Sequence, residues 1–442
     1  MPIRQILNTN QDYYLINFDS DCKERVADDG RALSEFVVDE LKREPITDVF
    51  IMSHGWLGDL DDAKAQYDKW TANLWSCASD IEALKKKRPD FKPLLIGLHW
   101  PSKPFGNEDT GGAFDLNLAT EGDDVVKSAI ADQLALLGAS DEIGPQLETI
   151  YRAYLELDEP DTLPDEVREA YLEIESKLGL DGEDREPFDP EEIFRNALDA
   201  DQEEEESGSF AANFAGGFSW GDLLAPLRVL SFWRMKDRAR RFGESGANEL
   251  LRKMQQVTSG RDVRFHLMGH SFGCIAVTAM IAGSSEATMA PNPVHSVLLA
   301  QGAVSLWAYC PEIPHAKEKA GAFSRLIKNN RVKGAIVTTL SEHDSAVGFF
   351  YPLAAGVKFQ VDFAVELPKY GAVGEFGIQG LDDIAEGLIM GKKDHQYNFK
   401  AGRIYNLESS GVIKEKALVV GAHSDIAHPE VAHAWWQAVM VD

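Results

Sequence analysis

Short apolar runs alternate with segments of helical periodicity over the first hundred residues of the chain. The runs at 12–18, 47–53 and 93–99 have the length and apolar character of buried strands. Between them, 31–42 and 61–87 place apolar side chains at the three- and four-residue spacing of amphipathic helices. The order strand, helix, strand, helix, strand predicts a parallel sheet with helical crossovers.

The same alternation resumes after residue 220. It predicts strands at 263–268, 294–299, 333–340 and 417–420, and helices at 226–257 with a candidate break at Gly243, at 275–282, at 316–327 and from Pro429 onward. We therefore predict an α/β fold whose core, residues 1–102 and 220–442, is a mostly parallel sheet flanked by helices.

Two stretches interrupt this pattern. Residues 103–219 contain helix-like pieces at 123–137, 145–157 and 166–178, separated by breaks rich in Pro and Asp. We predict that this segment is an acidic helical insertion or lid and not part of the sheet. Residues 345–415 show no regular period and are predicted to form a second insert within the core.

The charge of the chain is concentrated in the first of these stretches. The formal net charge is −28, and residues 101–210, with 32 acidic and 7 basic side chains, contribute −25 of it. The remainder is nearly balanced, which argues against nucleic-acid binding by the body of the protein. The acidic segment is interpreted either as a solvated lid or as a surface that binds a basic partner or cations.

Other compositional features bear on location. The chain has no run of 18 apolar residues, so no membrane span is expected, and its N-terminus lacks the pattern of a signal peptide. The four cysteines are widely spaced and form no metal or redox motif, although a disulfide between them stays open: Cys22, Cys77, Cys274 and Cys310. These features favour a reduced, cytoplasmic setting, and they leave the oligomeric state open.

The sequence Gly269-His270-Ser271-Phe272-Gly273 lies between an apolar run and an apolar segment rich in small residues. A Gly-x-Ser-x-Gly pattern between a strand and a helix is typical of a nucleophile elbow, a sharp turn that lifts a serine hydroxyl above a sheet. The glycines prevent collisions with the neighbouring strand and helix. We therefore predict that Ser271 is a nucleophile at a helix N-terminus, where backbone N–H groups favour negative charge.

Two further polar residues follow predicted strands downstream of Ser271. Asp344 follows the strand at 333–340, and His423 follows the strand at 417–420. Open parallel sheets place their sites at the carboxyl ends of strands. A serine nucleophile needs an imidazole to take its proton and a carboxylate to orient that imidazole. We predict that His423 is the base and Asp344 the orienting acid.

Neighbouring titratable residues are alternatives for these roles. Glu342 is the alternative acid, and His428 and His433 are alternative bases that lie further past the strand end. A metal site built from residues 423–428 lacks a second ligand cluster, so no metal and no cofactor is expected. His270, beside the nucleophile, is assigned no role in catalysis.

An oxyanion hole requires two backbone N–H groups aimed at the developing negative charge. One donor is expected to be Phe272 N–H, immediately after the nucleophile. The other is expected to be Trp56 N–H, in the loop His54-Gly55-Trp56 that follows an early strand. In this arrangement the side chain of His54 is structural and is not a base.

Taken together, these pieces resemble the α/β-hydrolase fold of serine hydrolases. The matching residues are the loop His54-Gly55-Trp56, the pentapeptide 269–273, Asp344 and His423. The strand ending Trp100-Pro101-Ser102 is similar to a largely uncharacterised lipase/esterase-like branch. The resemblance covers about 13–102 and 220–440. The segment between Asp344 and His423 is longer than in many members of the family.

The resemblance implies a serine hydrolase that cleaves a small-molecule carboxylic ester through an acyl-enzyme intermediate, without a cofactor. The residues that bind the substrate are not identified. Hydrolysis of an amide, thioester or peptide by the same residues is an alternative, because the leaving-group pocket decides between them. A second alternative is a non-catalytic or weakly catalytic protein of this fold that binds a basic partner through its acidic insertion.

Overall fold

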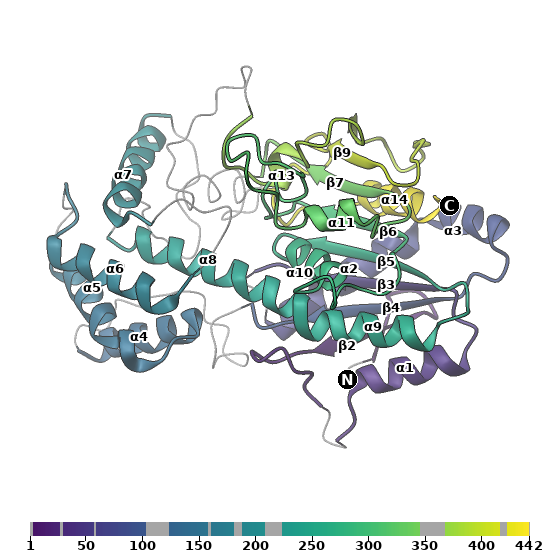
Figure 1. Cartoon of the computed structure of the whole chain (residues 1–442), viewed down its shortest axis with the longest axis horizontal. Coiled ribbons are helices and arrows are strands. Elements are labelled where there is room, and N and C mark those ends of the chain that lie inside the picture. The colour runs from purple at the N-terminus through teal and green to yellow at the C-terminus, as the bar shows by residue number, and fades with distance from the viewer. Residues whose placement is uncertain are drawn as a thin grey trace.

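A nine-stranded sheet forms the centre of the protein (Figure 1). The computed structural model describes residues 3–26, 30–56, 59–102, 123–157, 161–180, 188–207, 223–344, 367–415 and 422–441. The strands are β1 (Ile3–Gln5), β2 (Asp12–Asn17), β3 (Asp48–Ser53), β4 (Pro93–His99), β5 (Arg264–His270), β6 (Ser296–Ala300), β7 (Ile336–Leu340), β8 (Ala385–Ile389) and β9 (Ile404–Glu408). Their order is β1-β2-β4-β3-β5-β6-β7-β9-β8, and every neighbouring pair except β1–β2 is parallel. The predicted α/β class with a mostly parallel sheet is confirmed.

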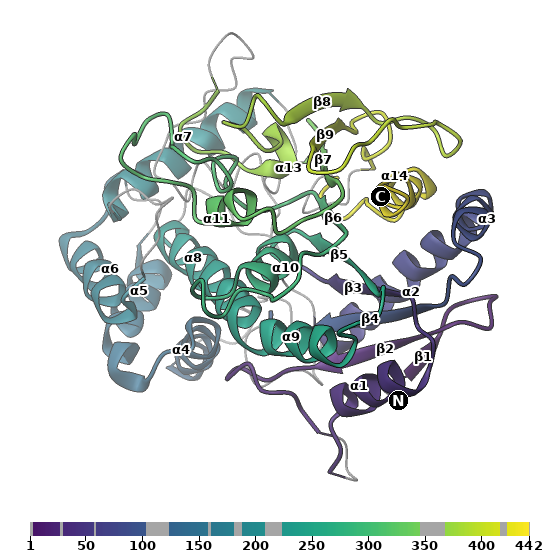
Figure 2. The same ribbon diagram turned by 45° about the vertical axis from the view of Figure 1, so that its right-hand side comes forward.

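Helices cover both faces of the sheet (Figure 2). One layer contains α1 (Leu33–Arg43), α8 (Ala225–Phe242), α9 (Asn248–Val257) and α10 (Gly273–Ala282), and the other contains α2 (Leu60–Ser76), α3 (Ala78–Lys87) and α14 (Pro429–Val439). Alternate side chains of one strand enter the two layers. In β3, Val49 and Ile51 pack with the first layer, and Phe50 and Met52 pack with the second. Burial on both faces explains why the central strands are continuous apolar runs.

Four helices between β4 and α8 form a separate apolar cluster: α4 (Asp123–Leu137), α5 (Gly144–Glu156), α6 (Asp165–Leu178) and α7 (Pro190–Ser207). They lie beside α8 on the side of it away from the sheet (Figure 1). Two arginines of α8 hold the end of α4, because Arg234 Nε donates to Leu137 O and Arg238 Nη2 donates to Leu136 O. Arginines at the last carbonyls of a helix satisfy its unpaired acceptors and complement its dipole.

Helix boundaries differ from the predicted ones at several places. The helix expected at 61–87 is broken at Cys77 into α2 and α3. The helix at 226–257 continues past Gly243 through one π-helical turn, Gly243–Ala247. There α10 packs so closely that a Cβ at Gly243 would lie 2.5 Å from Ala276 O. The helix expected at 316–327 is reduced to α11 (Ser324–Lys328).

The range 345–415, predicted as an irregular insert, contributes strands to the sheet. β9 pairs with β7, and β8 forms the edge beyond it. The prediction was wrong for this part because β8 is an edge strand whose side chains are mostly not buried, so it has no apolar run. The short helix α13 (Val373–Phe376) precedes them.

The predicted strand at 417–420 lies outside the described residues. Within the described part of the chain, no helix is long and apolar enough to cross a bilayer.

Candidate active site

The predicted site residues lie at the carboxyl ends of strands in the middle of the sheet. Trp56 follows β3, Ser271 follows the adjacent β5, and Asp344 follows β7. All these strands are parallel, so their carboxyl ends lie at the same edge, where open α/β sheets place their sites. His423 reaches this edge from the segment that precedes α14.

Ser271 occupies a strained turn between β5 and α10. Its φ is 55°, in the left-handed region that non-glycine residues seldom adopt. The flanking glycines are required by close contacts, because a Cβ at Gly269 would lie 2.5 Å from Cys274 N and one at Gly273 would lie 2.2 Å from Ser53 O. The turn therefore has the strained strand-to-helix geometry of a nucleophile elbow.

The loop His54-Gly55-Trp56 lies directly against this turn. A Cβ at Gly55 would be 2.5 Å from Ser271 Cβ and 3.1 Å from its Oγ, so only glycine permits this approach. Phe272 N–H, at the start of α10, makes no hydrogen bond to any described residue. Both segments expected to supply oxyanion donors thus adjoin Ser271, and no described residue accepts from the Phe272 donor.

His54 has a structural environment. Its ring is fully buried and stacks on Trp100 at a centroid distance of 5.6 Å. Its Nδ1 lies 2.8 Å from Gly55 O, and its Nε2 lies 2.9 Å from His99 Nδ1. Burial lowers the pKa of His54 to about 4, so the ring is neutral at neutral pH and donates its Nδ1–H to the Gly55 carbonyl. His54 therefore fixes the conformation of the loop.

His423 and Asp344 form a buried pair. His423 Nδ1 lies 2.8 Å from Asp344 Oδ2, and the Asp344 side chain is fully buried. The alternative acid, Glu342, is exposed and lies 3.8 Å from His343 Nε2. The alternative bases pair elsewhere, His428 with Asp425 and His433 with Asp80. The geometry therefore favours Asp344 and His423 over their rivals.

Ser271 Oγ makes no hydrogen bond to the ring of His423 within the described residues. Hydrogen bonds between a nucleophile and its base are often long without substrate and shorten when substrate binds. The residue that precedes Ser271 in the sequence does contact His423, because His270 Nε2 lies 2.9 Å from the backbone oxygen of His423. His270, which was assigned no role from the sequence, is therefore part of the site.

Gln301 is a second site residue that the sequence reasoning missed. Its Nε2 donates to Asp344 Oδ2 over 2.7 Å. Thr339 orients the amide, since its hydroxyl donates to Gln301 Oε1 over 2.8 Å. Gln301 directly follows β6, between the strands that carry Ser271 and Asp344, and this position at a strand end was a usable signal.

Glu375, on α13, places a second carboxyl group near Asp344. Its Oε2 is buried and has no hydrogen-bond partner among the described residues. Burial, and next the negative charge of Asp344, raise the pKa of Glu375 to about 7. No feature of the irregular 345–415 sequence marked this residue.

Aromatic side chains surround the two expected oxyanion residues. The ring centroids of Trp56 and Phe272 are 5.9 Å apart, and Phe232 of α8 lies 5.1 Å from Phe272 and 6.3 Å from Trp56. Trp56 is partly exposed, and the other two rings are buried. Helix α8 thus contributes an apolar side chain directly beside the site.

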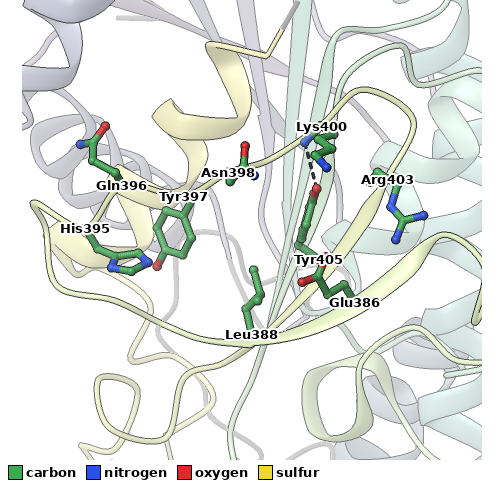
Figure 3. A pocket seen from close by; sticks show the side chains of 9 residues that line it. All are labelled: Glu386, Leu388, His395, Gln396, Tyr397, Asn398, Lys400, Arg403 and Tyr405. Atoms are coloured by element: carbon green, nitrogen blue, oxygen red, sulfur yellow. Dashed lines mark hydrogen bonds between the residues drawn. The ribbon is translucent and has the colours of Figure 1, made fainter.

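A pocket of about 480 Å³ lies elsewhere, over β8 and β9. Glu386 and Leu388 of β8 and Tyr405 of β9 form one side of it, and the loop at 395–400 forms the other (Figure 3). It shares no residue with the Ser271 site and is not counted as part of it.

Comparisons with known proteins and a search for metal sites add no further assignment. No family model, curated protein or solved structure matches this chain. Among the described residues, no group of three or more His, Cys, Asp or Glu side chains could hold a metal ion. The functional proposal therefore depends on the geometry around Ser271.

Proposed function

We propose that the protein is a serine hydrolase of the α/β-hydrolase type that cleaves a carboxylic ester through an acyl-enzyme intermediate. The observation that carries the proposal is the combination of Ser271 in a left-handed turn with the buried Asp344–His423 pair at the same sheet edge. A strained serine conformation is costly and is maintained where function requires it. A packing serine at a turn does not need a buried His–Asp pair beside it.

In the proposed reaction, Ser271 Oγ attacks the ester carbonyl carbon, and its proton passes to His423 Nε2. Asp344 accepts the Nδ1–H of His423, which fixes the tautomer and stabilises the imidazolium. The oxyanion accepts hydrogen bonds from Phe272 N–H and Trp56 N–H. The intermediate then expels the alcohol, which takes the proton from His423.

Deacylation reverses these roles. His423 removes a proton from a water molecule, which attacks the acyl carbonyl, and the proton returns to Ser271 Oγ as the carboxylic acid is released. The partly exposed ring of Trp56 and the neighbouring Phe232 and Phe272 favour an apolar group at the reacting carbonyl.

A fluorophosphonate probe tests this proposal together with nitrophenyl esters of increasing acyl length. We expect wild-type protein to be labelled and to release nitrophenol, and Ser271→Ala to do neither. Ser79→Ala, at an exposed serine of α3, is the matched control and should behave as wild type.

Two outcomes would reject the proposal. One is wild-type protein that neither reacts with the probe nor hydrolyses any ester, which would favour the non-catalytic alternative with a basic partner. The other is labelling that persists in Ser271→Ala. Parallel assays with thioester and anilide substrates separate ester hydrolysis from the alternatives that share its acyl chemistry.

A further inference from the structure

His270 joins the strand of the nucleophile to the segment of the base. Its ring is buried, and Nε2–H donates to the backbone carbonyl of His423 over 2.9 Å. The two imidazole rings lie 4.9 Å apart, and Trp70 packs against His270 edge-on at 5.7 Å. The residue next to Ser271 in the sequence therefore holds the main chain of the proposed base.

The hydrogen-bonding state of His270 is fixed by its surroundings. A carbonyl oxygen only accepts, so the ring proton must reside on Nε2. Burial, and next the charge of His423, lower the pKa of His270 to about 3, so the ring is neutral at neutral pH. At neutral pH the Nε2–H is therefore held by the His423 carbonyl.

Packing alone does not explain a histidine at this position. Its Nδ1 is buried and has no hydrogen-bond partner among the described residues. An unsatisfied buried nitrogen destabilises the folded state, whereas an apolar side chain of similar size would fill the space without this cost. The hydrogen bond from Nε2–H is the contribution that only a polar side chain makes here.

The segment around His423 has a second attachment, on the side of the acid. Ala422 N–H donates to His343 O over 2.9 Å, next to Asp344. That bond and the Asp344 pair fix His423 relative to β7, but neither fixes it relative to β5. The bond from His270 supplies the connection to β5, beside Ser271.

We propose that His270 is a positioning residue whose Nε2–H sets the distance between Ser271 Oγ and His423 Nε2. This inference rests on the proposed function and deepens it. A displacement of about 1 Å between reacting groups can lower a rate by about 100-fold. Loss of the bond should therefore slow acylation without weakening substrate binding.

The test compares two substitutions. His270→Leu removes the donor and keeps an apolar side chain of similar size, whereas His270→Gln keeps an N–H donor near the place of imidazole Nε2. For each, kcat and KM for a nitrophenyl ester, the rate of fluorophosphonate labelling, the pH profile and the thermal midpoint are measured. Met254→Ala, in α9, is the control for a destabilised core away from the site.

We expect His270→Leu to lower kcat and the labelling rate by about 10- to 100-fold with KM within about twofold of wild type. His270→Gln should recover most of that loss and keep the wild-type pH profile. Met254→Ala should lower the thermal midpoint with little effect on kcat. Wild-type rates in His270→Leu, or no recovery in His270→Gln, would overturn the inference while Ser271-dependent labelling of wild type still supports the proposed function. Absence of labelling in wild type would instead reject both.

A measurement on the unmodified chain keeps the inference testable if His270→Leu does not fold. NMR of ¹⁵N-histidine-labelled protein should show, among the buried histidines, a non-titrating imidazole in the Nε2–H form between pH 5 and 8 that is absent from His270→Gln and is thereby assigned to His270. An Nδ1–H form, or titration of this ring in that range, would overturn the inference.

Discussion

The titration of Glu375, near the site, links the stability of the protein to pH. Its pKa is raised from 4.5 to about 7 because the group is buried and lies near the negative charge of Asp344. The folded protein therefore binds this proton more tightly than the unfolded chain does. The resulting stability is fully present below about pH 4.5 and is lost as the pH rises to about 7.

The prediction concerns Glu375→Gln, which removes this titration. We expect the variant to become more stable relative to wild type as the pH is raised from 5 to 8, so that its free energy of unfolding increases relative to that of wild type. Urea unfolding at both pH values measures the difference. Glu249→Gln, an exposed glutamate on α9, is the control, and its difference from wild type should be independent of pH. A difference for Glu375→Gln that is equal at both pH values would contradict the assignment.

The sequence was informative about residues that belong to a motif and uninformative about residues that act through side-chain contacts. Ser271 was predictable because its turn needs glycines at fixed positions, and Asp344 and His423 because a serine nucleophile needs such partners. The contacts of Gln301 and His270 join segments that are 43 and 153 residues away in the chain. Contacts between residues so far apart in the chain produce no local period or spacing in the sequence.

At the scale of elements, the approach of the His54–Trp56 loop to the elbow is the critical contact. We predict that Gly55→Ala lowers kcat/KM by about 100- to 1000-fold, because its new methyl group would lie 2.5 Å from Ser271 Cβ and push the Trp56 donor away. Ester hydrolysis and thermal unfolding should be measured together. Gly144→Ala, where a Cβ meets nothing within 4 Å, is the matched control. An active Gly55→Ala would show that this loop does not form the oxyanion hole.

Elements were predictable where burial is strong and regular. The strands at 47–53 and 93–99 are buried on both faces, so their sequences are apolar runs that can be recognised without the structure. The sequence did not show β8, because an edge strand buries little and its side chains give no run. Nor did it show β9, which is mostly buried but whose apolar positions are interrupted by Asn406. It also did not show the break at Cys77, because the helical period continues across that residue.

At the scale of the molecule, the two ends of the sheet have different roles. The carboxyl ends carry the candidate site, and a buried polar network lies at the amino ends. Asp48 accepts from Arg88 Nη1 over 2.7 Å and from His266 Nε2 over 3.0 Å. His266 in turn contacts Ser296 Oγ at 2.9 Å, so the network joins β3, β5 and β6.

We predict that Asp48→Ala destabilises the protein by about 3 kcal/mol, because it leaves the largely buried Arg88 without its carboxylate. The kcat of the folded protein should stay near the wild-type value, since the network lies at the opposite sheet edge. Asp61→Ala removes an exposed ion pair with Lys64 and should change stability little. Urea unfolding and ester hydrolysis are the measurements, and an unchanged unfolding midpoint in Asp48→Ala would contradict the prediction.

The position of His423 in the chain has a consequence for biosynthesis. Ser271 and its proposed base, His423, are supplied by segments about 150 residues apart, with β6, β7, β8 and β9 between them. A growing chain therefore contains the proposed nucleophile long before the imidazole that would activate it has been translated. Under the proposed mechanism, a nascent or prematurely terminated chain would not hydrolyse an ester. Hydrolysis would begin only after α14 and the segment before it have packed against the sheet.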